Sequence, residues 1–176
     1  MEMLLSVQQK YILAVLRELG CLRKGQLQTV VQGCFDWPEA EAARRRMEAM
    51  LRQMCNGIGE FHSNAEFVWL GCSRPDARFL EAVDVMLELS GNRPKDFSTQ
   101  CQSPEILRFS LEGSSLRLFT VATLSDPLRV SGLARDSPGR IVWISDSGAA
   151  PDSLSLPPGH FFAARQPDGS HRFYGS

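Results

Sequence analysis

A cationic run in the segment "EAEAARRRMEAMLRQM", residues 39–54, is the feature of this sequence most able to bind a polyanion. Three consecutive arginines stand in its middle, and a fourth follows two helical turns later. A guanidinium group binds phosphate oxygens and the acceptor edge of guanine, so an exposed cluster of this kind is typical of a DNA contact. The candidate DNA-binding residues are Arg23, Lys24, Arg44, Arg45 and Arg52.

The helix that would present these arginines has an apolar face and a charged face when each residue turns by about 100°. The apolar face is predicted from Ala43, Met47, Met50, Leu51 and Met54. Arg45 and Arg52 fall on the opposite face, where Glu41 and Glu48 precede them by four residues in the favourable order for ion pairs. Two interpretations stay open: the arginines leave these pairs to contact DNA, or the face is only solvated or meets a protein partner.

The net charge of the chain does not favour binding to DNA. The chain has 176 residues, a formal net charge of −1, 43% hydrophobic and 22% charged residues. This composition indicates a cored, ordered protein and excludes a strongly basic nucleic-acid coat. Lysine and arginine equal aspartate and glutamate in number over residues 1–73, so any DNA contact depends on local placement of charge.

The cysteines and the N-terminal run indicate a cytoplasmic protein. The five cysteines include no C-x-x-C pair, which fits reduced thiols. The run "MEMLLSVQQKYILAVL" lacks a basic n-region and has polar residues among its apolar ones, so we do not expect an export signal. No stretch approaches the roughly 18 unbroken apolar residues of a membrane span.

Residues 1–73 are predicted to form a winged helix-turn-helix domain. Its predicted elements are helices over about 7–19, 24–32 and 37–54, and a hairpin over about 58–70. Ser6 and Gln9 form a capping box, Gly33 is expected to close the second helix, and Asp36 is expected to cap the third. Cys21 and Leu22 are expected to form a turn. A small helical bundle of unrelated role is the alternative.

Residues 74–176 are predicted to form an α+β domain. The predicted elements are a helix from Asp76 to Gly91, a loop over 92–104, a strand pair over 105–123, a short helix over about 125–135, a central strand over 140–145 and a terminal hairpin over 159–175. The run "RIVWIS" is continuously apolar, which predicts a strand buried on both faces. Leu107, Phe109 and Leu111 alternate with Arg108 and Ser110, which predicts a strand with one solvated face.

A family resemblance accompanies these patterns. The arrangement of "LSVQQKYILAVLRELGCLRKGQL", "AARRRMEAMLRQM" and "EFVWLG" is similar to the N-terminal winged helix of replication-relaxation type proteins of bacterial conjugative and plasmid elements. It resembles related uncharacterised families of Gram-positive mobile elements more closely still. The segments "EILRFSLEGSSLRLFTVAT" and "RIVWISDS" resemble a degenerate restriction-endonuclease-like core. The resemblance spans most of the chain and implies a role in DNA transactions or regulation.

The sequence predicts no nuclease site in that core. Such a site needs an acid at one strand end and an acid-x-Lys motif on the next strand to hold Mg²⁺ and a water. The last lysine, Lys95, precedes these strands, and after Glu112 the next strand offers Arg117, which cannot serve as a base. Asp126 and Asp146 are explained as a helix start and a strand-end turn.

Other chemistries have no framing motif either. Cys55, His62 and Cys72 lack zinc spacing, and Gly57 and Gly59 precede a strand instead of opening a helix around a phosphate. A Cys-His or Ser-His site on the three histidines stays open, although no motif indicates one. We therefore expect no metal and no cofactor.

These observations together predict a non-catalytic DNA-binding or regulatory protein that acts in replication, transfer or transcription of a bacterial mobile element. Double-stranded DNA is the expected partner, and a homodimer would double the few basic contacts. The alternative is a protein–protein adaptor whose winged helix does not bind DNA.

Overall fold

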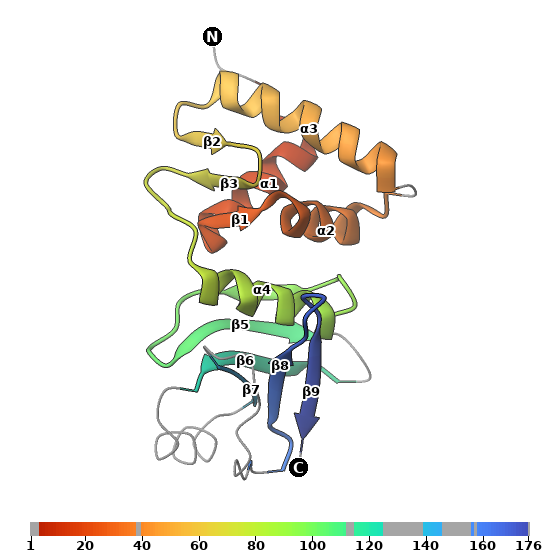
Figure 1. Ribbon diagram of the computed structural model, residues 1–176. Helices are drawn as coiled ribbons and strands as arrows, with labels where there is room; N and C mark the ends of the chain where they lie inside the picture. Colours follow the sequence, from red (N-terminus) through yellow and green to blue (C-terminus); the bar gives the residue numbers. More distant parts are fainter. Residues whose placement is uncertain are drawn as a thin grey trace. The chain divides into compact units, whose positions relative to one another are not determined.

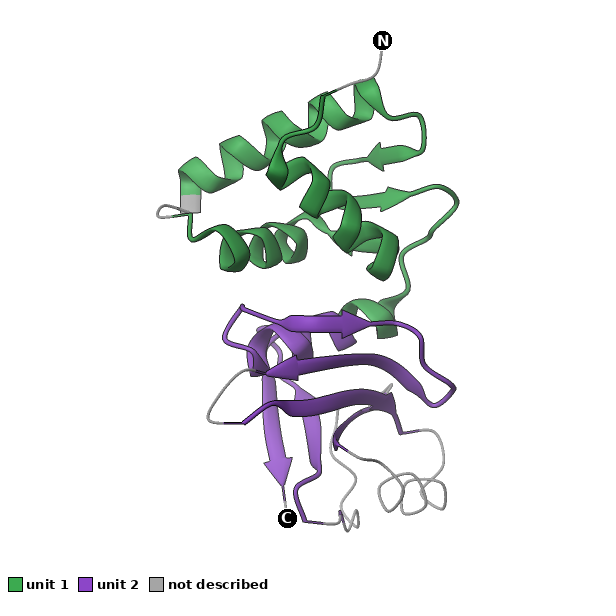
Figure 2. Ribbon diagram, turned by 180° about the vertical axis from the view of Figure 1, so that it is seen from behind, with its two compact units in different colours: residues 1–80 green, residues 81–176 purple. Residues whose placement is uncertain are grey.

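The computed structural model describes residues 4–37, 40–111, 115–124, 139–145, 156 and 158–175. The chain divides into two compact units, residues 1–80 and 81–176 (Figure 2). Helices and two separate sheets are present, which confirms the α+β class. The division lies within helix α4, Ala77–Leu89, a few residues beyond the boundary that the sequence suggests at residue 73.

The first unit combines three helices with a three-stranded sheet (Figure 1). Its elements are α1 (Val7–Leu19), β1 (Cys21–Arg23), α2 (Lys24–Phe35), α3 (Ala40–Gly57), β2 (Phe61–Ser63) and β3 (Phe67–Leu70). The sheet order is β1-β3-β2, and both strand pairs are antiparallel. Side chains from all three helices and from β1 fill its core, among them Ile12, Leu16, Leu22, Leu27 and Met54.

Helix α1 begins and ends where its sequence predicts. The Ser6 hydroxyl accepts a hydrogen bond from the Gln9 backbone N–H at 3.2 Å, and the Gln9 side-chain oxygen accepts from the Ser6 N–H at 2.9 Å. This confirms the capping box, which satisfies two backbone donors that the first turn leaves without helical partners. Gly20 ends the helix with φ of +75°, a backbone conformation that favours glycine.

Two predictions for the first unit are wrong. Cys21 and Leu22 form strand β1 and not a turn, because Leu22 is fully buried and its backbone pairs with Val68 of β3. Helix α2 continues beyond Gly33 to Phe35, whose ring packs edge-on against Tyr11 at 5.5 Å.

The helix ends around Asp36 also differ from the prediction. Asp36 adopts a left-handed conformation, with φ of 47°, and ends α2 instead of capping α3. Aspartate tolerates this conformation better than most residues, so the same side chain suits both a helix start and a helix end. Helix α3 extends to Gly57, about one turn beyond Met54.

The second unit is built on a six-stranded sheet with strands in the order of the chain. Its strands are β4 (Lys95–Ser98), β5 (Glu105–Leu111), β6 (Arg117–Thr123), β7 (Arg140–Ile144), β8 (Phe161–Arg165) and β9 (His171–Gly175). β7 pairs in parallel with β6 and β8, and the other pairs are antiparallel. Ile141, Val142, Trp143 and Ile144 are all buried, which confirms β7 as a strand covered on both faces.

Strands β4 and β5 correct two further predictions. The segment expected as a loop over 92–104 contains β4, which pairs with β5. Ser110 is buried and does not face solvent, because its hydroxyl donates to the Lys95 backbone carbonyl at 3.1 Å. Ser110, which was predicted to face solvent, thus links β5 to β4 through its side-chain hydrogen bond.

The start of α4 and the turn of the terminal hairpin follow the sequence. The Asp76 carboxylate accepts hydrogen bonds from the Arg78 and Phe79 backbone N–H groups at 2.8 and 3.1 Å, which confirms the start of α4. The turn between β8 and β9 is closed by Asp168, which accepts from the Ser170 N–H at 3.0 Å. The predicted helix over 125–135, and Glu112, Asp126 and Asp146, lie outside the described residues.

Candidate nucleic-acid interface

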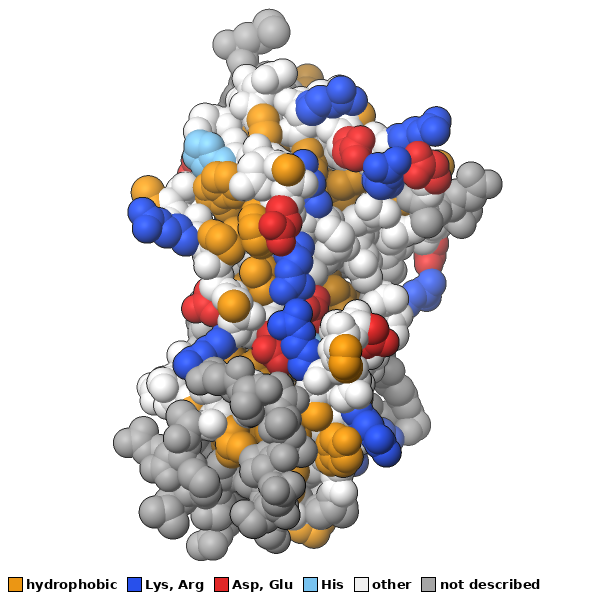
Figure 3. Space-filling view, in the orientation of Figure 1, with side chains coloured by type: hydrophobic (Ala, Val, Ile, Leu, Met, Phe, Trp, Pro, Cys, Tyr) orange, Lys and Arg blue, Asp and Glu red, His pale blue; other side chains and the backbone are white. Residues whose placement is uncertain are grey.

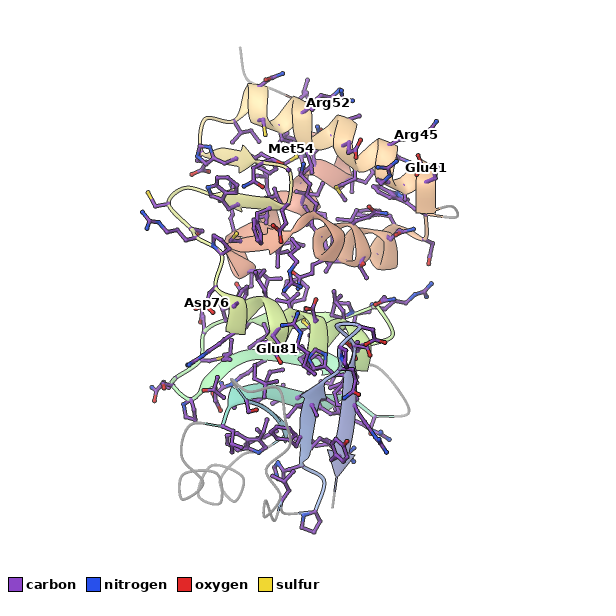
Figure 4. All side chains as sticks on the ribbon, viewed as in Figure 1. Glu41, Arg45, Arg52, Met54, Asp76 and Glu81 are labelled. Carbon is purple, nitrogen blue, oxygen red and sulfur yellow. The ribbon has the colours of Figure 1, made fainter. Side chains whose placement is uncertain are left out.

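Helix α3 buries its apolar face and turns its charged face outward. Its predicted apolar face is confirmed, since Ala43, Met47, Met50, Leu51 and Met54 are each 8% exposed or less. In Figure 4, Met54 points into the first unit, and Arg45 and Arg52 point away from it. The arginine side chains are therefore presented on a helix whose other face is fixed by packing.

Two of the candidate arginines share one carboxylate. Glu41 Oε1 lies 3.0 Å from Nη2 of Arg44 and 3.1 Å from Nε of Arg45, as the spacing of Glu41 and Arg45 predicts. The hydrogen bonds from Arg44 and Arg45 hold the pKa of Glu41 below its usual range. A phosphate that approaches this end of the helix must therefore compete with Glu41 for both guanidinium groups.

The second predicted pair, between Glu48 and Arg52, does not form. The carboxylate of Glu48 lies 3.6 Å from Nη1 of Arg44, which precedes it by about one helical turn. Nε of Arg52 instead donates to the backbone carbonyl of Glu48 at 3.4 Å. Glu48 has an arginine four residues away in each direction and contacts only the earlier one. Within the part of the chain that the structure describes, Arg52 consequently has no carboxylate partner.

Charges of both signs alternate along α3. Figure 3 shows the Lys and Arg side chains interleaved with acidic ones on this part of the molecule. The helix contains four arginines and two glutamates, which leaves it cationic on balance. Arg46 lies on the flank, with its guanidinium carbon 5.1 Å from the centre of the Trp37 ring, a cation–π contact.

Arg23 and Lys24 lie at a different place from Arg44 and Arg45. Arg23 ends β1 opposite Phe67, and Lys24 opens α2 with its backbone N–H bonded to the Glu66 carbonyl at 2.8 Å. Burial raises the pKa of the Cys55 thiol, and the positive charge of Lys24 opposes that rise, so Lys24 is near the last turn of α3. The structure thus groups Arg44 with Arg45, and places Lys24 toward the other end of the helix.

The β2–β3 hairpin carries an aromatic pair that the sequence motifs do not reveal. His62 and Trp69 are directly opposite in the ladder, and their rings stack with centroids 5.6 Å apart. The turn between the strands is formed by Asn64, whose side-chain oxygen accepts from the Glu66 and Phe67 N–H groups. The position of the turn determines this pairing: outward from it, Ser63 pairs with Val68 and His62 pairs with Trp69. Residues 58–70 contain no lysine or arginine.

The described residues contain no group of three or more His, Cys, Asp or Glu side chains able to hold a metal ion. Nor does the described part of the chain hold a helix with the length and apolar character needed to cross a bilayer. The arrangement on α3 is suited to contact with a polyanion. A comparison of the chain with protein-family models, curated proteins and solved structures finds no match.

Proposed function

We propose that the first unit is a winged helix-turn-helix domain that binds double-stranded DNA through the outward face of α3. The element order α1-β1-α2-α3-β2-β3 and the sheet order β1-β3-β2 support this assignment, with α2 and α3 as the helix-turn-helix and the β2–β3 hairpin as the wing. The observation that carries the proposal is Arg52, exposed on the face opposite the buried methionines and held by a single backbone carbonyl.

The proposed contact has two parts. Arg52 is ready to bind a phosphate, because the bond it gives up is a long one to an exposed carbonyl. Arg44 and Arg45 first have to exchange Glu41 for DNA, which is feasible since exposed ion pairs contribute little to stability. An α-helix fits the major groove, so one of these guanidinium groups can also reach a guanine edge.

The charge balance supports weak, salt-sensitive binding by one copy of the chain. The acidic residues of α3 repel phosphate, and the predicted wing adds Glu60 and Glu66 and no cation. A homodimer that places two copies of α3 on neighbouring half-sites would double the cationic contacts. The resemblance to mobile-element families supports a regulatory or accessory role in replication, transfer or transcription, without catalysis by the α+β domain.

A second candidate function is that of a protein–protein adaptor. The exposed His62 ring stacked on Trp69, between Glu60 and Glu66, favours a protein surface over a phosphate backbone as the partner of this hairpin. In this alternative, α3 remains in contact with solvent or with protein.

Binding of a fluorescent duplex of random sequence at two salt concentrations tests the proposal. A phosphate contact by Arg52 alone should lower the affinity about 3.5-fold between roughly 50 and 200 mM salt, since each contact contributes about 0.9 to the logarithmic slope. Three contacts, with Arg44 and Arg45 also released from Glu41, should lower it about 40-fold. The double variant Arg45→Glu, Arg52→Glu should lose this binding. The variant Lys10→Glu, Arg17→Glu makes the same charge change on exposed residues of α1, at the same spacing, and should retain most of it.

Equal binding by the two double variants would contradict the assignment of α3 as the DNA-binding helix. Absence of binding by the unaltered chain at every salt concentration would favour the adaptor.

A further inference from the structure

A buried histidine connects the last strand of the chain to helix α4. The side chain of His171, the first residue of β9, is 0% exposed. Its Nδ1 lies 2.9 Å from Oε1 of Glu88, and its Nε2 lies 3.4 Å from Oε1 of Glu81. The His171 backbone N–H also donates to Oε2 of Glu88 at 3.0 Å. Figure 1 shows the β8–β9 hairpin reaching α4, and Figure 4 labels Glu81 there.

The two glutamates are positioned by the helix. Glu81 and Glu88 are seven residues apart, about two turns, so they lie on the same face of α4. Side-chain exposures of 12% for Glu81 and 31% for Glu88 put both carboxylates at the edge of the buried region. The ring of His171 therefore faces a carboxylate oxygen at each of its nitrogens.

When both glutamates are ionised, only one protonation state of the ring satisfies both contacts. A neutral imidazole has one N–H and one lone pair, whereas the imidazolium cation has two N–H donors. With Nδ1–H donated to Glu88, a neutral ring would direct its Nε2 lone pair at the carboxylate of Glu81. A lone pair that faces a carboxylate oxygen is unfavourable here, since the fully buried ring nitrogen has no water to bond to instead.

We propose that His171, Glu81 and Glu88 form a proton-dependent latch that holds the β8–β9 hairpin on α4. When His171 carries both ring protons, it donates one hydrogen bond to each glutamate. When the pH rises and the ring loses its Nε2 proton, the contact to Glu81 becomes repulsive and the hairpin is held less firmly. Histidine is the side chain that ordinarily changes charge between about pH 5 and 8, so a comparison of pH values across that range tests the latch.

Other charged groups lie on the elements next to the ring. Asp84 lies on α4 between the two glutamates, and Asp168 in the hairpin turn is bonded to its own turn residues. Arg165 of β8 is opposite His171 in the ladder, and Arg172 is its neighbour on β9; both are exposed, where water screens their charge. Glu81 and Glu88 provide the polar contacts to the ring.

Hydrogen exchange of the β9 amides tests the latch on the full chain, as protection factors at about pH 6 and about pH 8.5. Protection should fall about tenfold or more at the higher pH, the factor that one charge-assisted hydrogen bond contributes. In the Glu81→Gln variant it should stay nearly constant, because a glutamine amide accepts from the imidazolium and donates to the neutral ring. Constant protection in the unaltered chain, or an equal fall in Glu81→Gln, would overturn the proposal.

Nitrogen-15 NMR of the rings gives a second test that does not depend on a variant. The chain has three histidines, and Nδ1 of His160 accepts from the Ile141 backbone N–H at 3.0 Å, which marks it as singly protonated. At about pH 6, His171 should show both nitrogens protonated. An unprotonated Nε2 at that pH would overturn the latch. Neither test involves DNA, so the latch and the proposed function can fail separately.

Discussion

If the first unit binds DNA as proposed, replacing Glu41 with glutamine should strengthen that binding. Glu41 is the carboxylate that Arg44 and Arg45 share, at 3.0 and 3.1 Å, and it is itself a negative charge on the proposed contact face. Glutamine keeps the length of the side chain and its helix propensity but removes the charge. Arg45 then becomes available to phosphates without a competing carboxylate, and Arg44 keeps only its contact with Glu48 at 3.6 Å.

The size of this effect follows from the number of arginines that Glu41 holds. Each arginine that gains a phosphate contact adds about 0.9 to the slope of log affinity against log salt. Release of one or both should therefore steepen the slope by about 1 to 2. Across a fourfold change in salt, each new contact adds a factor of about 3.5 to the loss of affinity.

Fluorescence anisotropy with a labelled duplex, over a series of salt concentrations, measures this slope. Glu60→Gln is the matched control, because Glu60 is exposed on the hairpin side of the first unit and its charge change is the same. The control should alter affinity slightly and leave the slope unchanged. If Glu41→Gln and Glu60→Gln give the same slope as the unaltered chain, Arg44 and Arg45 gain no phosphate contact from the loss of the Glu41 charge.

Three further predictions concern stability. Met54→Ala empties a fully buried site and should lower the free energy of unfolding by about 2–5 kcal/mol in urea titrations; an unchanged midpoint would contradict the packing of α3. Gly139→Ala would place a Cβ 2.6 Å from a carbonyl oxygen of β6 and should cost about 1–3 kcal/mol, whereas Gly25→Ala, with open space in α2, should be neutral or stabilising by up to about 1 kcal/mol. The third prediction concerns Glu41, whose pKa is lowered by its two arginine partners. The contribution of Glu41 to the stability of the fold should be present above the ordinary carboxyl range near pH 4, and it should be lost as the pH falls toward the lowered pKa. The difference in unfolding midpoint between the unaltered chain and Glu41→Gln should accordingly shrink in acid, and a difference that persists below about pH 2 would refute this assignment.

The features predicted correctly from the sequence are those that depend on neighbours along the chain. Ser6 and Asp76 mark helix starts because their side chains accept from N–H groups two or three residues later. The buried methionines of α3 and the apolar run of β7 follow from periodicity alone. These signals are local, so no knowledge of the rest of the fold is needed.

The features that were missed depend on distant partners or on a choice between equivalent ones. Leu22 lies in a strand because of Val68, and β4 exists because of β5, pairings that no local pattern specifies. Glu48 has an arginine four residues away on each side, and the spacing alone does not decide between them. The contact of His171 with Glu81 joins residues 90 positions apart and left no sign in the sequence.

The most direct test of the account is an NMR titration of the chain with a short duplex, followed through the side-chain Nε–H signals of arginine. We predict that the signals of Arg44, Arg45 and Arg52 shift at low salt and return as salt is added. The signal of Arg17, on the exposed side of α1, should shift much less. Shifts confined to arginines outside α3, or no shifts at any duplex concentration, would contradict the claim that the outward face of α3 binds DNA.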